Sequence, residues 1–93
     1  MATAHVTLAD VENFNRELRR FIDEEFALLH RLRQRAMALG ETWHDRKYQE
    51  LMASFDPLTK DLEKFLRQAE DILPYLRKTE ANIRQYENEK LPG

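Results

Sequence analysis

The chain has 93 residues, of which 42% are hydrophobic and 34% are charged, and its formal net charge is −2. It has only 2 glycines and 3 prolines, too few for the many tight turns of an all-β domain, and it has no cysteine for disulfides or thiolate metal ligands. This charge gives no general attraction to nucleic acid or anionic membranes. We therefore expect one all-α domain over residues 1–93.

The first predicted helix spans residues 7–39 and begins with a capping box, in which Thr7 caps the helix and Asp10 reaches back. Its apolar residues recur three and four positions apart, as in an amphipathic helix, with two interruptions at Glu25 and Arg35. They are Val11, Phe14, Leu18, Phe21, Leu28, Leu32 and Leu39. A flanking line of Ile22, Leu29 and Ala36 widens this stripe. Gly40 follows the last apolar residue, where a left-handed helix end favours glycine.

A short bend over residues 40–42 and a second capping box, from Thr42 to Asp45, precede the second predicted helix, residues 43–88. Its stripe runs through Tyr48, Leu51, Phe55, Leu58, Leu62, Phe65, Ala69, Ile72, Leu76, Thr79, Ile83 and Tyr86, with Met52, Leu66 and Leu73 beside it. Pro57 and Pro74 lie within this stretch. Each predicts a kink or a break, because proline cannot donate the helical hydrogen bond.

So short a bend predicts an antiparallel two-helix hairpin, with Leu18, Leu32, Leu51, Leu62 and Phe65 in its core. The second helix is longer than the first, so residues from 75 onward are expected to lack a partner alongside the first helix. Either this segment packs on another chain or it bends back at Pro74. Both stripes are also wider than one helix contact needs. We therefore expect a dimer that forms a four-helix bundle. The predicted oligomer interface comprises Ile22, Leu29, Leu66, Leu73, Leu76, Ile83 and Tyr86. The balanced charge favours a homodimer, and a heterodimer with a related hairpin stays open.

Candidate chemistry is sparse. The histidines, His5, His30 and His44, have no metal-ligand spacing, and Ser54 has no histidine placed to activate it. We expect no enzyme activity, no cofactor and no metal. The arginines of the first helix are interspersed with acidic residues, which is typical of a solvated helix face. A nucleic-acid-binding regulator is therefore the least favoured function.

The bend carries the most informative side chain, because Trp43 either seals the end of the helix contact or is presented to a partner, and the two roles are compatible. Residues 39–48, followed by Phe55, resemble the WXG family of small helical hairpins, the early-secreted-antigen-like proteins of type VII secretion. The match has Trp43, Asp45 in the place of the family's glycine, and Tyr48 three residues later. The family's export signal, Tyr-x-x-x-Asp/Glu, is not formed at Tyr86.

The resemblance implies a protein that acts through protein–protein interaction, as a substrate or partner in a type VII-like secretion or toxin-delivery system. The alternative is a cytoplasmic adaptor or chaperone-like subunit of a larger bacterial assembly that is not exported. The N-terminal residues lack the basic and apolar segments of a signal peptide, and no run of apolar residues is long enough to cross a bilayer. We expect a cytoplasmic protein without membrane insertion, or one secreted without a cleaved signal peptide.

Overall fold

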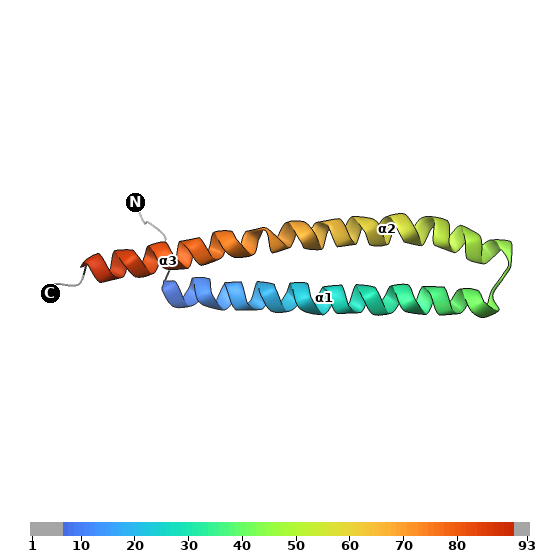
Figure 1. Ribbon diagram of the computed structural model, residues 1–93, viewed down its shortest axis with the longest axis horizontal. Coiled ribbons are helices and arrows are strands. Elements are labelled where there is room, and N and C mark those ends of the chain that lie inside the picture. Colours follow the sequence, from blue (N-terminus) through green and yellow to red (C-terminus); the bar gives the residue numbers. More distant parts are fainter. Residues whose placement is uncertain (1–6, 91–93) are drawn as a thin grey trace.

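The computed structural model describes residues 7–90, and this part of the chain is entirely helical apart from the cap residue, one short connection and one turn residue. The helices are α1 (Leu8–Thr42), α2 (Arg46–Glu70) and α3 (Ile72–Lys90). Figure 1 shows α2 and α3 following each other as one long bent helix that lies alongside α1 and runs in the opposite direction. The predicted all-α class is confirmed, and the molecule is a hairpin-like rod with extents of 73 × 25 × 16 Å.

Helix α1 begins where the sequence predicts it. The Thr7 hydroxyl accepts a hydrogen bond from the backbone N–H of Asp10 at 3.1 Å, so one of the open donors of the first turn is satisfied. Val11 in the first turn is buried. Val6, the other half of an expected apolar contact at this end, lies outside the described residues.

The connection between the helices lies later in the chain than residues 40–42. Residues 40–42 belong to α1, so Gly40 is helical and is not a left-handed helix end. The cap of α2 is Asp45, whose carboxylate accepts from the N–H groups of Lys47 and Tyr48 at 2.9 and 3.3 Å. The predicted cap at Thr42 is wrong, because its hydroxyl donates instead to the carbonyl of Leu39 at 3.5 Å.

The two prolines have different effects. Pro57 lies inside α2, which continues without a break. The regular helix is interrupted instead at Asp71, whose N–H bonds to the carbonyl of Gln68 at 3.2 Å, a tighter turn than the α-helix has. Pro74 lies four residues after Glu70 and cannot donate to the carbonyl of that residue, which explains why the interruption falls here.

The contact between the helices, called the seam below, buries seven residues. These are Val11, Ile22 and Leu29 of α1, Thr59, Leu66 and Ala69 of α2, and Leu73 of α3. Leu18 and Phe26 are partly buried against its centre. Four of the seven, Ile22, Leu29, Leu66 and Leu73, belong to the flanking lines of the predicted stripes. The predicted core is wrong for Leu32, Leu51, Leu62 and Phe65, whose side chains are 40–55% exposed.

The C-terminal helix has a partner within the chain for much of its length. The Asn15 side-chain amide donates to the Glu80 carboxylate at 3.1 Å, and Arg84 pairs with Glu12 at 3.3 Å. The expectation that residues from 75 onward lack an intramolecular partner is thus wrong. Only the last part of α3 extends past the start of α1 (Figure 1). Helix α1 is three residues longer at its C-terminus than predicted, and long side chains at its N-terminus reach α3.

Candidate functional site: the exposed apolar side

Thirteen large hydrophobic side chains of the described residues are exposed and lie outside the seam. Ten of them, each between 40% and 66% exposed, form what is called the apolar side below. Its members are Phe14, Phe21, Leu28, Leu32 and Leu39 of α1, Leu51, Leu58, Leu62 and Phe65 of α2, and Ile72 of α3. The seam, in contrast, includes Thr59 and Ala69, with the half-buried Ala36 and Gly40 on α1. Small residues allow the two helices to approach closely, and the bulky residues remain outside.

One rule of position places all ten residues on the same side of the helix pair. Each directly precedes a buried or half-buried residue, as Phe21 precedes Ile22 and Phe65 precedes Leu66. One residue is a rotation of about 100° around an α-helix. The two helices are antiparallel and face each other at the contact. In both of them, the residue that precedes a contact residue therefore lies on the same side of the pair. The apolar side is therefore continuous across both helices.

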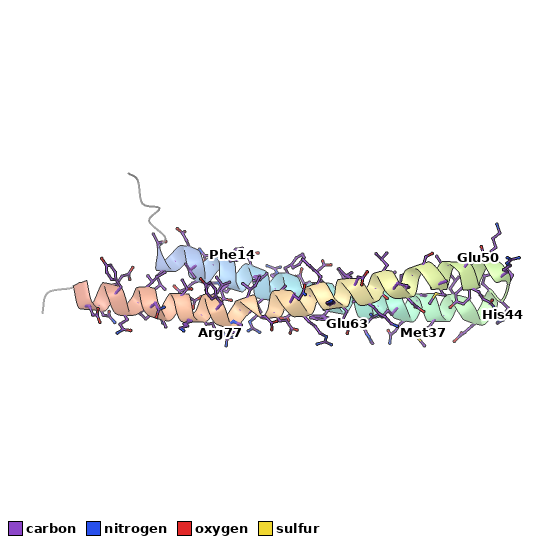
Figure 2. The ribbon with its side chains drawn as sticks, turned by 90° about the horizontal axis from the view of Figure 1, so that it is seen from above. Phe14, Met37, His44, Glu50, Glu63 and Arg77 are labelled. Carbon is purple, nitrogen blue, oxygen red and sulfur yellow. The ribbon has the colours of Figure 1, made fainter. Side chains whose placement is uncertain are left out.

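The opposite side of the pair carries ion pairs. Glu12 and Arg84 each directly follow a residue of the helix contact, Val11 and Ile83, and they bond to each other across the helices at 3.3 Å. Figure 2 shows Phe14 on one long edge of the molecule and Glu63 and Arg77 on the other. Phe26, the large aromatic on the charged side, is covered by Arg67, whose guanidinium carbon lies 5.5 Å from the ring centroid.

Glu63 is the centre of this charged side. Its carboxylate accepts hydrogen bonds from Arg67 on its own helix at 3.1 Å and from Arg33 on α1 at 3.3 Å. These two bonds, that from Arg67 foremost, lower the pKa of Glu63 below its ordinary value. Glu63 therefore remains ionised and links α1 to α2 at neutral pH.

The extent of the apolar side exceeds what a monomer ordinarily exposes. A whole aromatic side chain has about 200 Å² of surface and a leucine somewhat less, so ten half-exposed side chains present on the order of 900 Å². The largest apolar patch of a typical monomer is about 300–600 Å². An apolar surface of this size in one continuous strip indicates an interaction surface.

The bend residues Trp43, Asp45 and Tyr48 lie together at the tip of the helix pair. The Trp43 and Tyr48 rings are 5.8 Å apart between centroids and inclined by 54°, and both side chains are half-buried. Trp43 ends α1 by donating its backbone N–H to Leu39 at 3.0 Å, and Asp45 begins α2. Each of these three side chains thus has a structural role in closing the tip, and the partly exposed Trp43 ring also remains open to a partner.

The residues predicted for an oligomer interface differ in how far they are buried within the single chain. Ile22, Leu29, Leu66 and Leu73 are buried in the seam of the single chain, and Leu76 and Ile83 are half-buried. Tyr86 is exposed near the end of α3. Four of the seven predicted interface residues thus pack within the single chain. The signal that distinguishes the two lines was residue size, because Ala36, Gly40, Thr59 and Ala69 mark the seam.

Two findings concern other kinds of site. Within residues 7–90, no three histidine, aspartate or glutamate side chains are grouped so that they could hold a metal ion. His30 and His44 are exposed, and His5 lies outside the described residues. No helix of the part that the structure describes has the length and apolar character needed to cross a membrane.

Comparison of the chain with protein-family models, curated proteins and solved structures gives no match.

Proposed function

We propose that the chain is a protein–protein interaction module, not an enzyme, and that it binds the helices of a partner through its apolar side. The observation that carries this proposal is the strip of ten exposed large apolar residues along one side of a helix pair. Helices that bury such a strip against other helices gain about 25 cal/mol for each Å² removed from water. The partner is a second copy of the chain, a related helical hairpin, or a helical segment of a larger assembly.

We further propose that the module serves as a WXG-like substrate or partner in a type VII-like secretion or toxin-delivery system of a bacterium. The resemblance around Trp43 supports this proposal, as does the position of Trp43 at the tip, against Tyr48. The chain forms an all-helical rod. A rod of this kind is compatible with export as a compact helical pair, or with docking of that pair on the secretion system. Assembly of two such pairs into a four-helix bundle would cover the apolar side.

A secretion assay tests the function. The tagged chain is produced in bacteria with and without the membrane ATPase of the secretion system, and the culture medium is compared with the cells. Appearance in the medium only when the ATPase is present is the expected result. Phe65→Glu on the apolar side should abolish it, whereas Met37→Glu should not, because Met37 is equally apolar and 69% exposed but lies off the apolar side.

Two results would contradict parts of the proposal. A chain that stays in the cells in both strains, yet needs Phe65 to remain in a larger complex, would replace export with the adaptor function. If Phe65→Glu and Met37→Glu behaved alike in every assay, the apolar side would have no role in recognition.

A further inference from the structure

We infer that the chain binds phosphate, as the free ion or as the phosphate group of a small molecule, in a cleft between α1 and α3. The cleft has a volume of about 220 Å³. It is lined by Glu12, Asn15, Arg16 and Arg19 of α1 and by Arg77 and Glu80 of α3. The ion pair of Glu12 and the position of Arg77 in Figure 2 place it on the charged side, away from the apolar side. This ligand is therefore additional to the proposed helical partner.

The first supporting feature is that two arginines lie opposite each other across the helix contact. Glu12 of α1 pairs with Arg84 of α3 at 3.3 Å, which fixes the register of the two helices. Arg19 lies seven residues after Glu12. Arg77 lies seven residues before Arg84. Seven residues are about two helical turns, so this step along both antiparallel helices brings Arg19 level with Arg77.

This like-charged pair differs from the ion pairs that cross the same helix contact. Those pairs join opposite charges, Glu12 with Arg84 and Arg33 with Glu63. Arg19 and Arg77 instead place two positive charges opposite each other, and a negative charge between them would remove the repulsion. An anion in the cleft would thus link α1 to α3, as the carboxylate of Glu63 links α1 to α2.

The second feature is that the arginines of the cleft have no acidic partner. Among the described residues, Arg16, Arg19 and Arg77 form no ion pair. Asp23, one helical turn after Arg19, forms none either. Arg16 donates a hydrogen bond to the side-chain oxygen of Asn13. All three arginines are exposed, so their remaining N–H groups are accessible to a ligand.

The two acidic residues of the lining already have partners of their own. Glu12 pairs with Arg84 at 3.3 Å, and Glu80 accepts a hydrogen bond from the Asn15 amide at 3.1 Å. With Arg84 included, the cleft has four arginines and two carboxylates, a surplus of two positive charges. The whole chain has a net charge of −2. The surplus is therefore a local property of the cleft and not of the molecule.

The third feature is the match between this lining and a phosphate group. A phosphate monoester carries a charge of about −1.5 to −2 at neutral pH and has three strong acceptor oxygens. Guanidinium groups donate paired hydrogen bonds to such oxygens. A carboxylate has a single charge and would neutralise only half of the surplus. Every lining residue is charged or an amide, so the cleft favours a ligand that consists of little besides the phosphate group.

Isothermal titration calorimetry of the whole chain with inorganic phosphate and with glycerol 3-phosphate, at constant ionic strength, tests the ligand. We expect saturable binding at a single site. Arg19→Gln and Arg77→Gln should each weaken binding by about tenfold or more, because a hydrogen bond between charged groups is lost. Arg31→Gln is the matched control. It removes the same charge from an exposed position outside the cleft and should leave binding unchanged.

The titrations distinguish the possible ligands. Tighter binding of glycerol 3-phosphate would identify a monoester as the ligand, and tighter binding of inorganic phosphate would identify the free ion. No saturable binding of either probe by the natural chain, or equal binding by all four chains, would overturn the inference. Binding only to vesicles that contain phosphatidate would overturn the small ligand. Phe65→Glu should bind phosphate as the natural chain does, so failure here leaves the proposed function untouched.

The melting temperature of the ligand-free chain tests the like-charged pair directly. Arg19→Glu and Arg77→Glu each create a pair of opposite charges, so each should raise the melting temperature by a few degrees at low ionic strength. The double variant again places like charges opposite each other and should melt below either single variant. All three should lose phosphate binding while remaining helical by circular dichroism. Additive changes in melting temperature would show that the two residues do not face each other and would overturn the site.

Discussion

Gly40 and Tyr48 are in such close contact that no other residue fits at position 40 without a rearrangement. A Cβ atom on Gly40 would come within 2.5 Å of the Tyr48 hydroxyl oxygen and within 2.7 Å of the ring. The same hydroxyl donates a hydrogen bond at 2.8 Å to the carbonyl of Ala36, one turn earlier in α1. The glycine therefore allows the ring of α2 to lie on the backbone of α1 at the tip.

This contact makes the effect of Gly40→Ala depend on residue 48. In the natural chain the added methyl group displaces the Tyr48 ring and breaks its bond to Ala36, worth about 1 kcal/mol. That loss offsets the gain of about 1 kcal/mol that alanine brings to a helix interior. In a Tyr48→Ala background the clash is absent, so Gly40→Ala should stabilise by about 1 kcal/mol. Urea unfolding of the four chains measures the coupling, and additive effects would contradict the close contact.

The seam and the apolar side should respond differently to truncation. Leu66 is 0% exposed, so Leu66→Ala should cost about 2–5 kcal/mol at every protein concentration. Leu58 is 66% exposed, and in dilute solution Leu58→Ala should change stability by no more than about 0.5 kcal/mol. Denaturant unfolding at low concentration makes the comparison. An equal loss at both positions would show that the seam is assigned to the wrong line of residues.

The cap of α2 can be located by two alanine substitutions. Asp45→Ala removes the acceptor of two backbone N–H groups, so it should cost about 1 kcal/mol. Thr42→Ala removes only a hydroxyl that donates to a carbonyl at 3.5 Å, and it should have little effect. The reverse order of the two losses in thermal unfolding would indicate that α2 begins at Thr42.

Acid should weaken the helix contact through Glu63. Its folded-state pKa lies below the ordinary glutamate value, so the ionised form stabilises the fold fully above the unfolded pKa of about 4.3. This contribution is lost as the pH falls through the folded-state pKa. Glu63→Gln should therefore be less stable than the natural chain at pH 7, and the difference should shrink in acid. A difference that is the same at pH 7 and pH 3 would exclude this contribution.

The hydrophobic periodicity, the start of α1 and the class of fold follow from the sequence, because they depend on local interactions. Thr7 caps α1 through an amide three residues away, and the three-and-four spacing of apolar residues allows only helices. The resemblance around Trp43 rests on a few residues and stays a prediction. The position of the bend does not follow from the sequence, because Thr42 and Asp45 are both good caps. In the structure Asp45 caps α2, and Tyr48, three residues later, packs against Trp43 and bonds to Ala36.

The tertiary structure alone decided which apolar line faces the partner helix. Each helix has two adjacent lines, about 100° apart, and both satisfy the same periodicity. The line with Ala36, Gly40, Thr59 and Ala69 lets the helices approach closely, whereas the line with the phenylalanines and most leucines would hold them further apart. The ion pairs of Glu12 with Arg84 and of Arg33 with Glu63 then fix the charged side. The bulky residues are left outside because close packing of two helices depends on complementary shape and not on hydrophobicity alone.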